Sequence, residues 1–236
     1  MKAFVLCRDR VTYARQCVDA LFAAGLEVVI VDHGSTWPPM VEWLTAPGKN
    51  PKLWTFTGPN RHPRDLWRLG GPIMQMVGAD ERFIVTDCDV IPDPACPRDW
   101  LARMWATLDR YPAVRKVGLG LRTDDLPAHF AHADMVRQWE AQYQAVGDGG
   151  RLNPMTSDTG AVIADIDTTL AMYRWYEPFT LGPAVRLRPP YVARHLPWYE
   201  STLHLDIEQQ YYRDHAEHGH WRNPTEYGDD YGLRQQ

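Results

Sequence analysis

The sequence predicts an α/β fold built on a mostly parallel, doubly wound sheet. In the first third of the chain, short apolar runs alternate with amphipathic segments, which is the pattern of strands and helices taken in turn. Two of the apolar runs end in an acid, one at Asp32 and one at Asp87. Acids are rarely tolerated at the end of a buried strand unless they are paired or bound to a cation. We therefore expect a ligand site at the strand ends.

The elements of the first half follow from the spacing of apolar residues. The run AFVLC at residues 3 to 7 predicts a strand, and Val11, Ala14 and Val18 then recur at helical spacing until Gly25 ends the helix. The other elements expected here are a strand at residues 27 to 32, a short helix at 40 to 46, a strand at 52 to 57, a helix at 64 to 77 interrupted near Gly70 and Gly71, and a strand at 82 to 89.

The second half carries less regular signals and no internal repeat. The expected elements are a helix at residues 99 to 111, a strand at 117 to 121, a helix around 135 to 146, a strand or hairpin at 160 to 174, an extended segment at 185 to 199 and a helix at 207 to 221. Because the chain has 236 residues, one domain with two unlike halves is the expected organisation.

Composition gives an ordinary globular chain. Hydrophobic residues make up 44% and the net charge is −5, so there is no strong signal for nucleic-acid or membrane binding. The four cysteines form no C-x-x-C pair, which favours free thiols in a reducing compartment. No segment has the length of a signal-peptide core or a membrane span. We expect a cytoplasmic protein.

Asp87 and Asp89 form the most specific signal in the sequence, within the stretch FIVTDCDVIP. In a strand, residues i and i+2 point to the same face, so the two carboxylates would project together. Two carboxylates with phosphate oxygens and waters suit Mg²⁺ or Mn²⁺. The alternative is a capped turn in which Asp89 and Asp93 bond loop amides.

The run EVVIVDHGST, followed by the DCD strand end, resembles the GT-A glycosyltransferases, in particular the family 2-like group that includes many bacterial sugar transferases. The resemblance covers residues 3 to 95. It implies a single GT-A domain over residues 1 to 236, with a nucleotide-sugar-binding half at 1 to 95 and an acceptor-binding half at 96 to 236. It further implies that Asp32 holds the base or ribose of the nucleotide. His33 stands where the family usually has Asp or Asn.

The same resemblance implies the donor and metal ligands. Asp87 and Asp89 would bind Mn²⁺ or Mg²⁺ and, with Cys88 between them, the nucleoside-diphosphate sugar, with a UDP-sugar favoured over a GDP-sugar. Two segments of the second half, IDTTLAMYR and PPYVARHLPWYES, look like parts of bacterial GT-A-like proteins. GT-A enzymes often add a late histidine to the metal, and His195 is the candidate. The alternative for His195 is packing beside Trp198 and Tyr199.

Further site residues are chosen by position. Arg8, Arg61 and Arg64 could contact the donor phosphates. An inverting transferase needs a carboxylate that deprotonates the acceptor hydroxyl, and Asp167 is our candidate base. The alternative for Asp167 is an Asx-type turn with Thr169. The rival bases are Asp165, Glu200, Asp206 and Glu208. The histidines between His215 and His220 are expected on the surface.

The expected function is a metal-dependent glycosyltransferase acting on an unidentified hydroxyl acceptor. One alternative is a haloacid-dehalogenase-like phosphatase that uses Asp87 as its nucleophile, with TDD at residues 123 to 125 as its later acid pair. Another is an inactive module that binds a nucleotide sugar. A sugar-phosphate nucleotidylyltransferase is disfavoured, because CRDRVTYAR is not a glycine-rich phosphate loop.

Overall fold

The computed structural model describes residues 1–46, 52–59, 63–141, 143, 160–175, 179–201 and 204–215. Its main sheet has eight strands in the order β3-β2-β1-β4-β9-β6-β10-β8. The strands are β1 (Lys2–Cys7), β2 (Glu27–Asp32), β3 (Leu53–Thr57), β4 (Phe83–Asp87), β6 (Lys116–Gly118), β8 (Ala161–Ile163), β9 (Ala171–Tyr173) and β10 (Ala184–Leu187). Four of the seven neighbouring pairs are parallel. The predicted α/β class with a mostly parallel sheet flanked by helices is confirmed.

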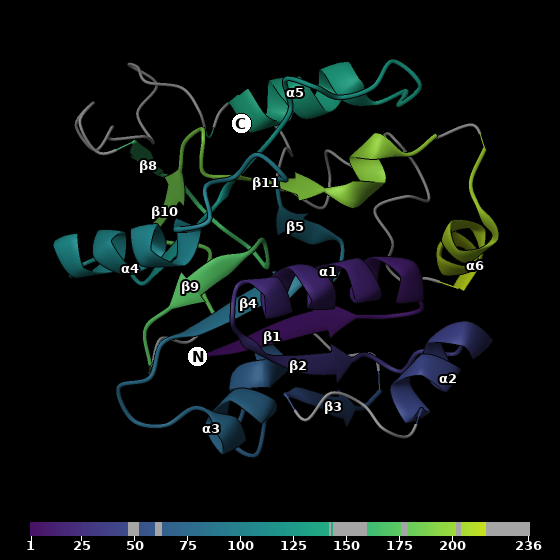
Figure 1. The fold of residues 1–236 in the computed structure, drawn as a ribbon, viewed down its shortest axis with the longest axis horizontal. Coiled ribbons are helices and arrows are strands. Elements are labelled where there is room, and N and C mark those ends of the chain that lie inside the picture. Colours follow the sequence, from purple (N-terminus) through teal and green to yellow (C-terminus); the bar gives the residue numbers. More distant parts are fainter. Residues whose placement is uncertain are drawn as a thin grey trace, which may run out of the picture.

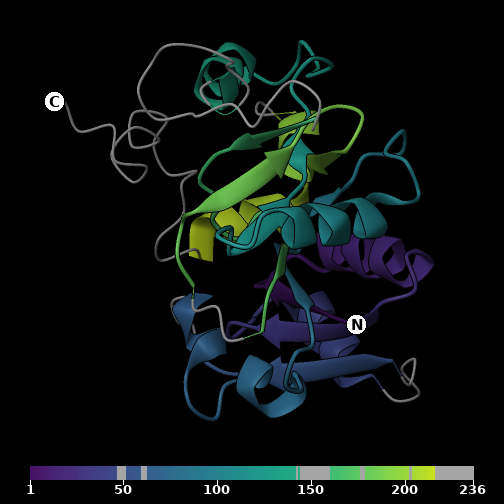
Figure 2. The same ribbon diagram turned by 90° about the vertical axis from the view of Figure 1, so that its left-hand side faces the viewer.

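Helices cover both faces of this sheet. One face packs against α1 (Val11–Ala23), α2 (Pro38–Thr45), α4 (Trp100–Arg110) and α5 (Ala133–Ala141). The other face carries the Phe4, Phe83 and Tyr173 rings and packs against the 3₁₀ helix η1 (Pro63–Trp67) and α3 (Pro72–Met76). α3 lies at one end of the molecule and α5 at the other in both views (Figures 1 and 2). Successive residues of β1 and β2 point to opposite faces of the sheet, so their buried side chains belong to two separate cores.

A second, three-stranded sheet has the order β5-β11-β7. It consists of β5 (Val90–Pro92), β7 (Gly120–Leu121) and β11 (Val192–His195), and a 3₁₀ helix, η3 (Leu196–Tyr199), follows β11. β5 begins three residues after β4 ends, and β11 pairs with it so that His195 lies opposite Val90. This pairing brings a late segment of the chain against the acid pair.

The carboxyl ends of β1, β2 and β4 lie at one edge of the main sheet, because these strands are parallel. β9 is antiparallel to both β4 and β6, and β10 is parallel to β6, so β6 and β10 end at the same edge. The last described helix, α6 (Ile207–His215), stands beyond the ends of β1 and β2 in Figure 1. Ligands of open α/β sheets bind outside this edge.

The element predictions are correct in type for the first half, although the strand expected at 82 to 89 ends at Asp87 and leaves Asp89 in a turn, and they need correction in the second half. The predicted helix at 64 to 77 is interrupted at Gly70, whose φ is +78°, and Gly71, where a side chain would meet the Asp65 and Leu66 carbonyls. The segment 160 to 174 is not a hairpin, because β8 pairs with β10 while β9 lies between β4 and β6. The expected strand at 117 to 121 is divided between the two sheets as β6 and β7.

Candidate functional site

Two buried acids fasten together the loops that follow β1 and β2. Asp9 accepts hydrogen bonds from the peptide N–H groups of Thr36 (2.5 Å) and Trp37 (2.7 Å), and its own N–H donates to the Ser35 hydroxyl. Asp32 accepts from Ser35, through its N–H at 3.1 Å and its hydroxyl at 2.5 Å. Burial raises the pKa of Asp32, and the Ser35 hydrogen bonds act against that shift. The sequence-predicted nucleotide ligand Asp32 therefore lies at the expected edge, where it shapes its own loop.

Asp87 ends β4 and is held by a segment from the second half of the chain. Its N–H donates to the Thr168 carbonyl at 3.0 Å, and its Oδ2 accepts from the Thr168 hydroxyl at 2.5 Å. Burial, Asp89 and Asp167 raise the pKa of Asp87 well above its usual value. Two further carboxylates thus act on Asp87 at the end of β4, and the Thr168 hydroxyl and Arg10 offset them only in part, which is an arrangement that a bound cation would relieve.

Asp89 lies one turn residue beyond β4 and is paired with Arg10. Arg10 Nη1 forms a hydrogen-bonded ion pair with Asp89 Oδ2, and both side chains are 7% exposed. His195 Nε2 is 3.6 Å from the same oxygen, while the His195 and Trp198 ring centroids are 4.7 Å apart. His195 therefore makes a contact of each expected kind, because it lies beside the acid pair, as a metal ligand would, and packs on Trp198.

The donor types at this edge suit a hard divalent cation. Asp87 and Asp89 offer carboxylate oxygens, and His195 offers an imidazole nitrogen close to Asp89. Within the described ranges, no three His, Cys, Asp or Glu side chains stand in a geometry that would hold a metal ion. Arg10 occupies the Asp89 oxygen that His195 approaches. The side chains thus fit the cation by chemistry, provided that Arg10 moves away from Asp89.

Asp167 lies next to Asp87 through their shared neighbour Thr168. Its Oδ1 accepts from the Thr169 N–H at 3.1 Å and hydroxyl at 2.7 Å, which is the turn expected as the alternative to a catalytic role. Burial raises the pKa of Asp167, but the Thr169 bonds, Arg186 and Lys116 outweigh it, so the pKa lies below its usual value. The Lys116 ammonium also donates to the Asp167 carbonyl at 3.2 Å.

The rival bases have other contacts. Glu208 accepts from the Thr12 N–H with both carboxylate oxygens, each at 3.1 Å, and so caps α1, whose N-cap residue Arg10 makes no side-chain cap. Asp206 accepts from the Gln209 N–H at the start of α6. Burial raises the pKa of Glu200, and the Tyr13 hydroxyl lowers it. Asp165 is exposed.

The remaining predicted residues divide by position. Arg8 follows β1 and donates to the His215 carbonyl at 3.4 Å, so it contacts the end of α6. Cys88 is 4% exposed and packs in the core, and burial raises the pKa of its thiol well above the usual value. Arg61, the side chain of Arg64 and the histidines after His215 lie outside the described residues.

Sequence reasoning missed Arg10, Thr168 and Tyr212. The Arg10 guanidinium carbon is 3.6 Å from the centre of the Tyr212 ring on α6. Thr168 precedes Thr169 in the IDTT stretch, and the local sequence does not indicate which of the two hydroxyls contacts Asp87. These roles come from contacts across the fold, so single-sequence patterns contain no signal for them.

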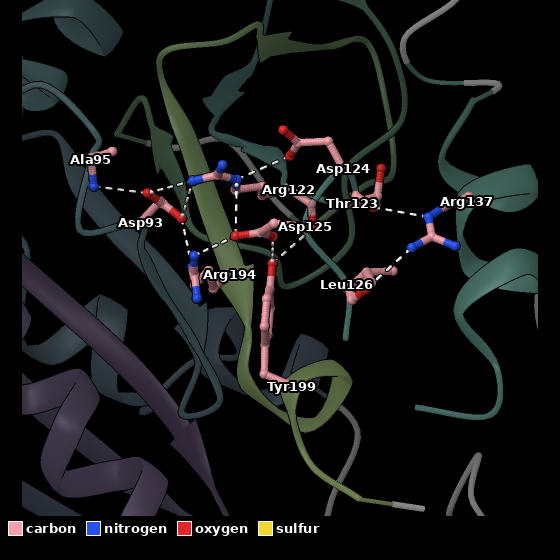
Figure 3. A network of polar contacts seen from close by, with 10 residues as sticks. All are labelled: Asp93, Ala95, Arg122, Thr123, Asp124, Asp125, Leu126, Arg137, Arg194 and Tyr199. Carbon is pink, nitrogen blue, oxygen red and sulfur yellow. Dashed lines mark hydrogen bonds and ion pairs between the residues drawn. The ribbon is translucent and has the colours of Figure 1, made fainter. Parts of the chain in front are cut away.

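A polar network braces the small sheet that carries His195 (Figure 3). Asp93, whose side chain is 1% exposed, accepts from Arg194 Nε at 2.6 Å and from an Arg122 amine at 3.2 Å. Asp125 pairs with both arginines and accepts from the Tyr199 hydroxyl at 2.8 Å. Asp93 and the 122 to 126 loop therefore fix the strand from which His195 projects.

A cavity of about 130 Å³ lies past the carboxyl end of β10. It is bordered by the buried ion pair of Arg186 with Glu140, at 3.0 Å, and by Tyr143, whose ring centre is 3.9 Å from the guanidinium. Apolar walls come from Leu121, Leu187 and Val192. This cavity opens beyond the same sheet edge as the acid pair.

Comparisons with known proteins leave the family open. The chain matches no protein-family model, and no curated protein is significantly similar to it. Solved structures with an overall likeness include the Pyrobaculum calidifontis mannosyltransferase in complex with GDP-Man and Mn²⁺, at 18% identity and a TM-score of 0.48, covering 82% of this chain and 55% of that one. Staphylococcus aureus TarS with UDP-GlcNAc has 14% identity and a TM-score of 0.45, with 88% and 60% covered.

The UTP-bound UGPase of Acinetobacter baumannii has 13% identity and a TM-score of 0.48, and 100% of this chain and 99% of that chain are covered. The chain thus spans between half and two thirds of the mannosyltransferase and TarS chains. At these identities and TM-scores, the likeness assigns neither a family nor an activity.

Among the helices in the described part of the chain, none is long and apolar enough to cross a bilayer.

Proposed function

We propose that the protein is a GT-A-type glycosyltransferase that moves a sugar from a nucleoside-diphosphate sugar to a hydroxyl acceptor with the help of Mn²⁺ or Mg²⁺. One observation carries the proposal. Asp87 and Asp89 lie at the carboxyl end of β4, and His195 Nε2 is 3.6 Å from Asp89. Asp32, which ends β2, and Asp9, which follows β1, lie at the same edge of the sheet. An acid pair with an imidazole at this position is suited to a cation that carries a diphosphate.

The residues of the chain divide the reaction between them. Asp87, Asp89 and His195 would hold the cation, which supplies charge neutralisation for the departing nucleoside diphosphate. Asp32 and the loop at residues 33 to 36 would receive the nucleoside. Thr168 orients the Asp87 carboxylate through its 2.5 Å hydrogen bond.

Asp167 is the proposed base for the acceptor hydroxyl. Its lowered pKa keeps it ionised at neutral pH, so it can accept a proton as the acceptor oxygen attacks. A base with a low pKa takes up the proton late, as the bond to the sugar forms. The main task of Asp167 is therefore to orient the acceptor hydroxyl. We propose that residues 96 to 236 bind the acceptor and that the cavity beside Arg186 and Glu140 receives part of it.

One contact favours this function over a phosphatase that uses Asp87 as its nucleophile. The acids proposed for the phosphatase, Asp124 and Asp125, are paired with Arg122 and stand in the network of Figure 3.

The test is release of UDP or GDP from a panel of UDP-sugars and GDP-sugars, with water as the acceptor because no other acceptor is supplied. We expect release that requires Mn²⁺ or Mg²⁺, stops with EDTA and is lost in Asp89→Asn. Release that survives Asp89→Asn would reject the proposed site. Hydrolysis of p-nitrophenyl phosphate that depends on Asp87 would support the phosphatase instead.

A further inference from the structure

The carboxylate that the proposed cation would use is already neutralised by a protein cation. Arg10 pairs with Asp89 Oδ2, and the two side chains are each 7% exposed. Arginine stays charged at every pH that proteins tolerate. Asp89 therefore has a resident counter-ion, and this ion is part of the first loop of the chain.

Helix α6 holds this counter-ion in place. The Tyr212 ring stacks on the Arg10 guanidinium at 3.6 Å, and Arg10 is only 5% exposed. Three further contacts dock α6 on the same edge: Glu208 on the Thr12 N–H, the Tyr211 hydroxyl on the Thr36 hydroxyl at 3.0 Å, and the Tyr211 ring at 4.7 Å from Trp37. The helix thus joins the loops after β1 and β2 to the Asp89 pair.

We propose that a divalent cation reaches Asp89 by displacing the Arg10 guanidinium, and that this displacement loosens α6 from the edge of the donor site. The inference rests on the proposed function, because it takes the cation site at Asp87 and Asp89 as given. A cation held between His195 and Asp89 Oδ2 would stand beside the Arg10 guanidinium on the same oxygen, and the two positive charges would repel each other. A buried guanidinium that has lost its carboxylate is unfavourable where it stands. Arg10 must then move, and its stack on Tyr212 is broken.

The arrangement couples metal binding to α6 in both directions. A contact that stabilises Arg10 on Asp89 lowers the apparent affinity for the cation, and a bound cation lowers the stability of the α6 contacts by the same factor. The Arg10 pair and the Tyr212 stack are the elements that the two states do not share. Removing either one should favour the cation-bound state.

The first experiment is a calorimetric titration of Mn²⁺ alone into wild-type protein, Arg10→Met and the exposed α1 control Arg15→Ala. We expect Arg10→Met to bind Mn²⁺ about tenfold or more tightly than wild type, since the competing cation is gone. Arg15→Ala should match wild type. Equal or weaker binding by Arg10→Met would overturn the inference while leaving the metal site in place.

If neither wild type nor Arg10→Met binds Mn²⁺, the metal site of the proposed function fails, and the inference fails with it. Because Arg10→Met leaves a buried carboxylate without its partner, Tyr212→Leu serves as the second variant. It removes only the ring that holds Arg10, and it should bind Mn²⁺ a fewfold more tightly, on the order of 3-fold. Unchanged affinity in Tyr212→Leu counts against the α6 part of the inference.

The second measurement needs no variant. Hydrogen exchange of the α6 amides in wild-type protein is followed with and without saturating Mn²⁺. We expect exchange in residues 207 to 215 to rise about tenfold when Mn²⁺ binds, and the α4 amides to stay unchanged. Exchange in α6 that stays the same or slows while Mn²⁺ is bound overturns the proposal.

Discussion

The Thr168 hydroxyl donates a 2.5 Å hydrogen bond to Asp87 Oδ2, while the Asp87 N–H donates to the Thr168 carbonyl. Two residues separated by 81 positions are thus joined through both backbone and side chain. The pairing sets the direction in which the Asp87 carboxylate faces. It also places Asp167, the proposed base, beside the proposed cation site.

Thr168→Val should weaken Mn²⁺-dependent binding of UDP or GDP. The substitution keeps the shape of the side chain but removes the donor that stabilises the ionised Asp87, and a hydrogen bond to a charged group contributes roughly 1.5 to 3 kcal/mol. We expect a loss of affinity of about tenfold at neutral pH and a larger loss at pH 6, because Asp87 is then protonated more easily. Titrations at the two pH values check this. Thr169→Val, which affects the Asp167 bond instead, is the control.

Lys116 gives the protein a stability that rises with pH in a defined window. Its buried ammonium donates to the Asp167 carbonyl and to the Tyr173 hydroxyl, and burial lowers its pKa to about 8. The unfolded chain, in which the Lys116 pKa is near 10.5, binds this proton more tightly. Between pH 8 and 10.5 the unfolded state therefore carries more protons, and the free energy of unfolding increases with pH.

Urea unfolding of wild type and Lys116→Met at several pH values between 7.5 and 10 measures this effect. The difference in slope between the two proteins isolates Lys116 from the tyrosines and cysteines that titrate nearby. We expect the wild type to gain stability relative to Lys116→Met as the pH rises. Parallel curves would show that the Lys116 pKa is not lowered.

Glu208→Ala should destabilise the protein by about 1 kcal/mol, because it removes the carboxylate that caps the N-terminus of α1. The substitution also removes a contact that docks α6. Glu42→Ala, on the exposed side of α2, is a matched control that should leave the unfolding midpoint unchanged. A Glu208 variant as stable as the Glu42 variant would mean that α1 needs no cap from α6.

Asp93→Asn should lower the urea midpoint and weaken Mn²⁺ binding, whereas Asp124→Asn should do neither. The Asp93 side chain is 1% exposed and bridges two arginines, while the Asp124 side chain is 76% exposed. Loss of the Asp93 charge leaves Asp125 as the acid that pairs with both Arg194 and Arg122, so the network that fixes the strand with His195 loses its most buried carboxylate. Circular dichroism during urea unfolding and a Mn²⁺ titration measure the two effects. Equal urea midpoints and equal Mn²⁺ affinities in the two variants would show that the Asp93 network does not support the metal site.

The sequence predicts most of the elements that local spacing determines. The strand that ends at Asp87 follows from its run of apolar residues and lies at the expected sheet edge, whereas Asp89 lies in the turn beyond β4, outside the strand in which the i, i+2 pattern would apply. The interruption near Gly70 follows from a backbone conformation that glycine adopts readily. Asp32 also lies where its strand predicts.

Choices of partner over long distances could not be predicted in this way. The segment around Ala171 forms a strand as expected, but its insertion between β4 and β6 depends on packing against both. The Arg10 and Asp89 pair spans 79 positions, and the Arg10 stack on Tyr212 spans most of the chain. A single sequence shows the charge of Arg10 but not the acid that it meets.

The measurement that tests the central claim most directly is calorimetric titration of UDP and GDP into the protein, with and without Mn²⁺, repeated on Asp87→Asn. Arg15→Ala provides the control for substitution at a distant surface position. The account predicts binding of at least one diphosphate that requires Mn²⁺ and disappears in Asp87→Asn. Equal binding by wild type and Asp87→Asn, or no binding of either nucleotide with Mn²⁺ present, would contradict it.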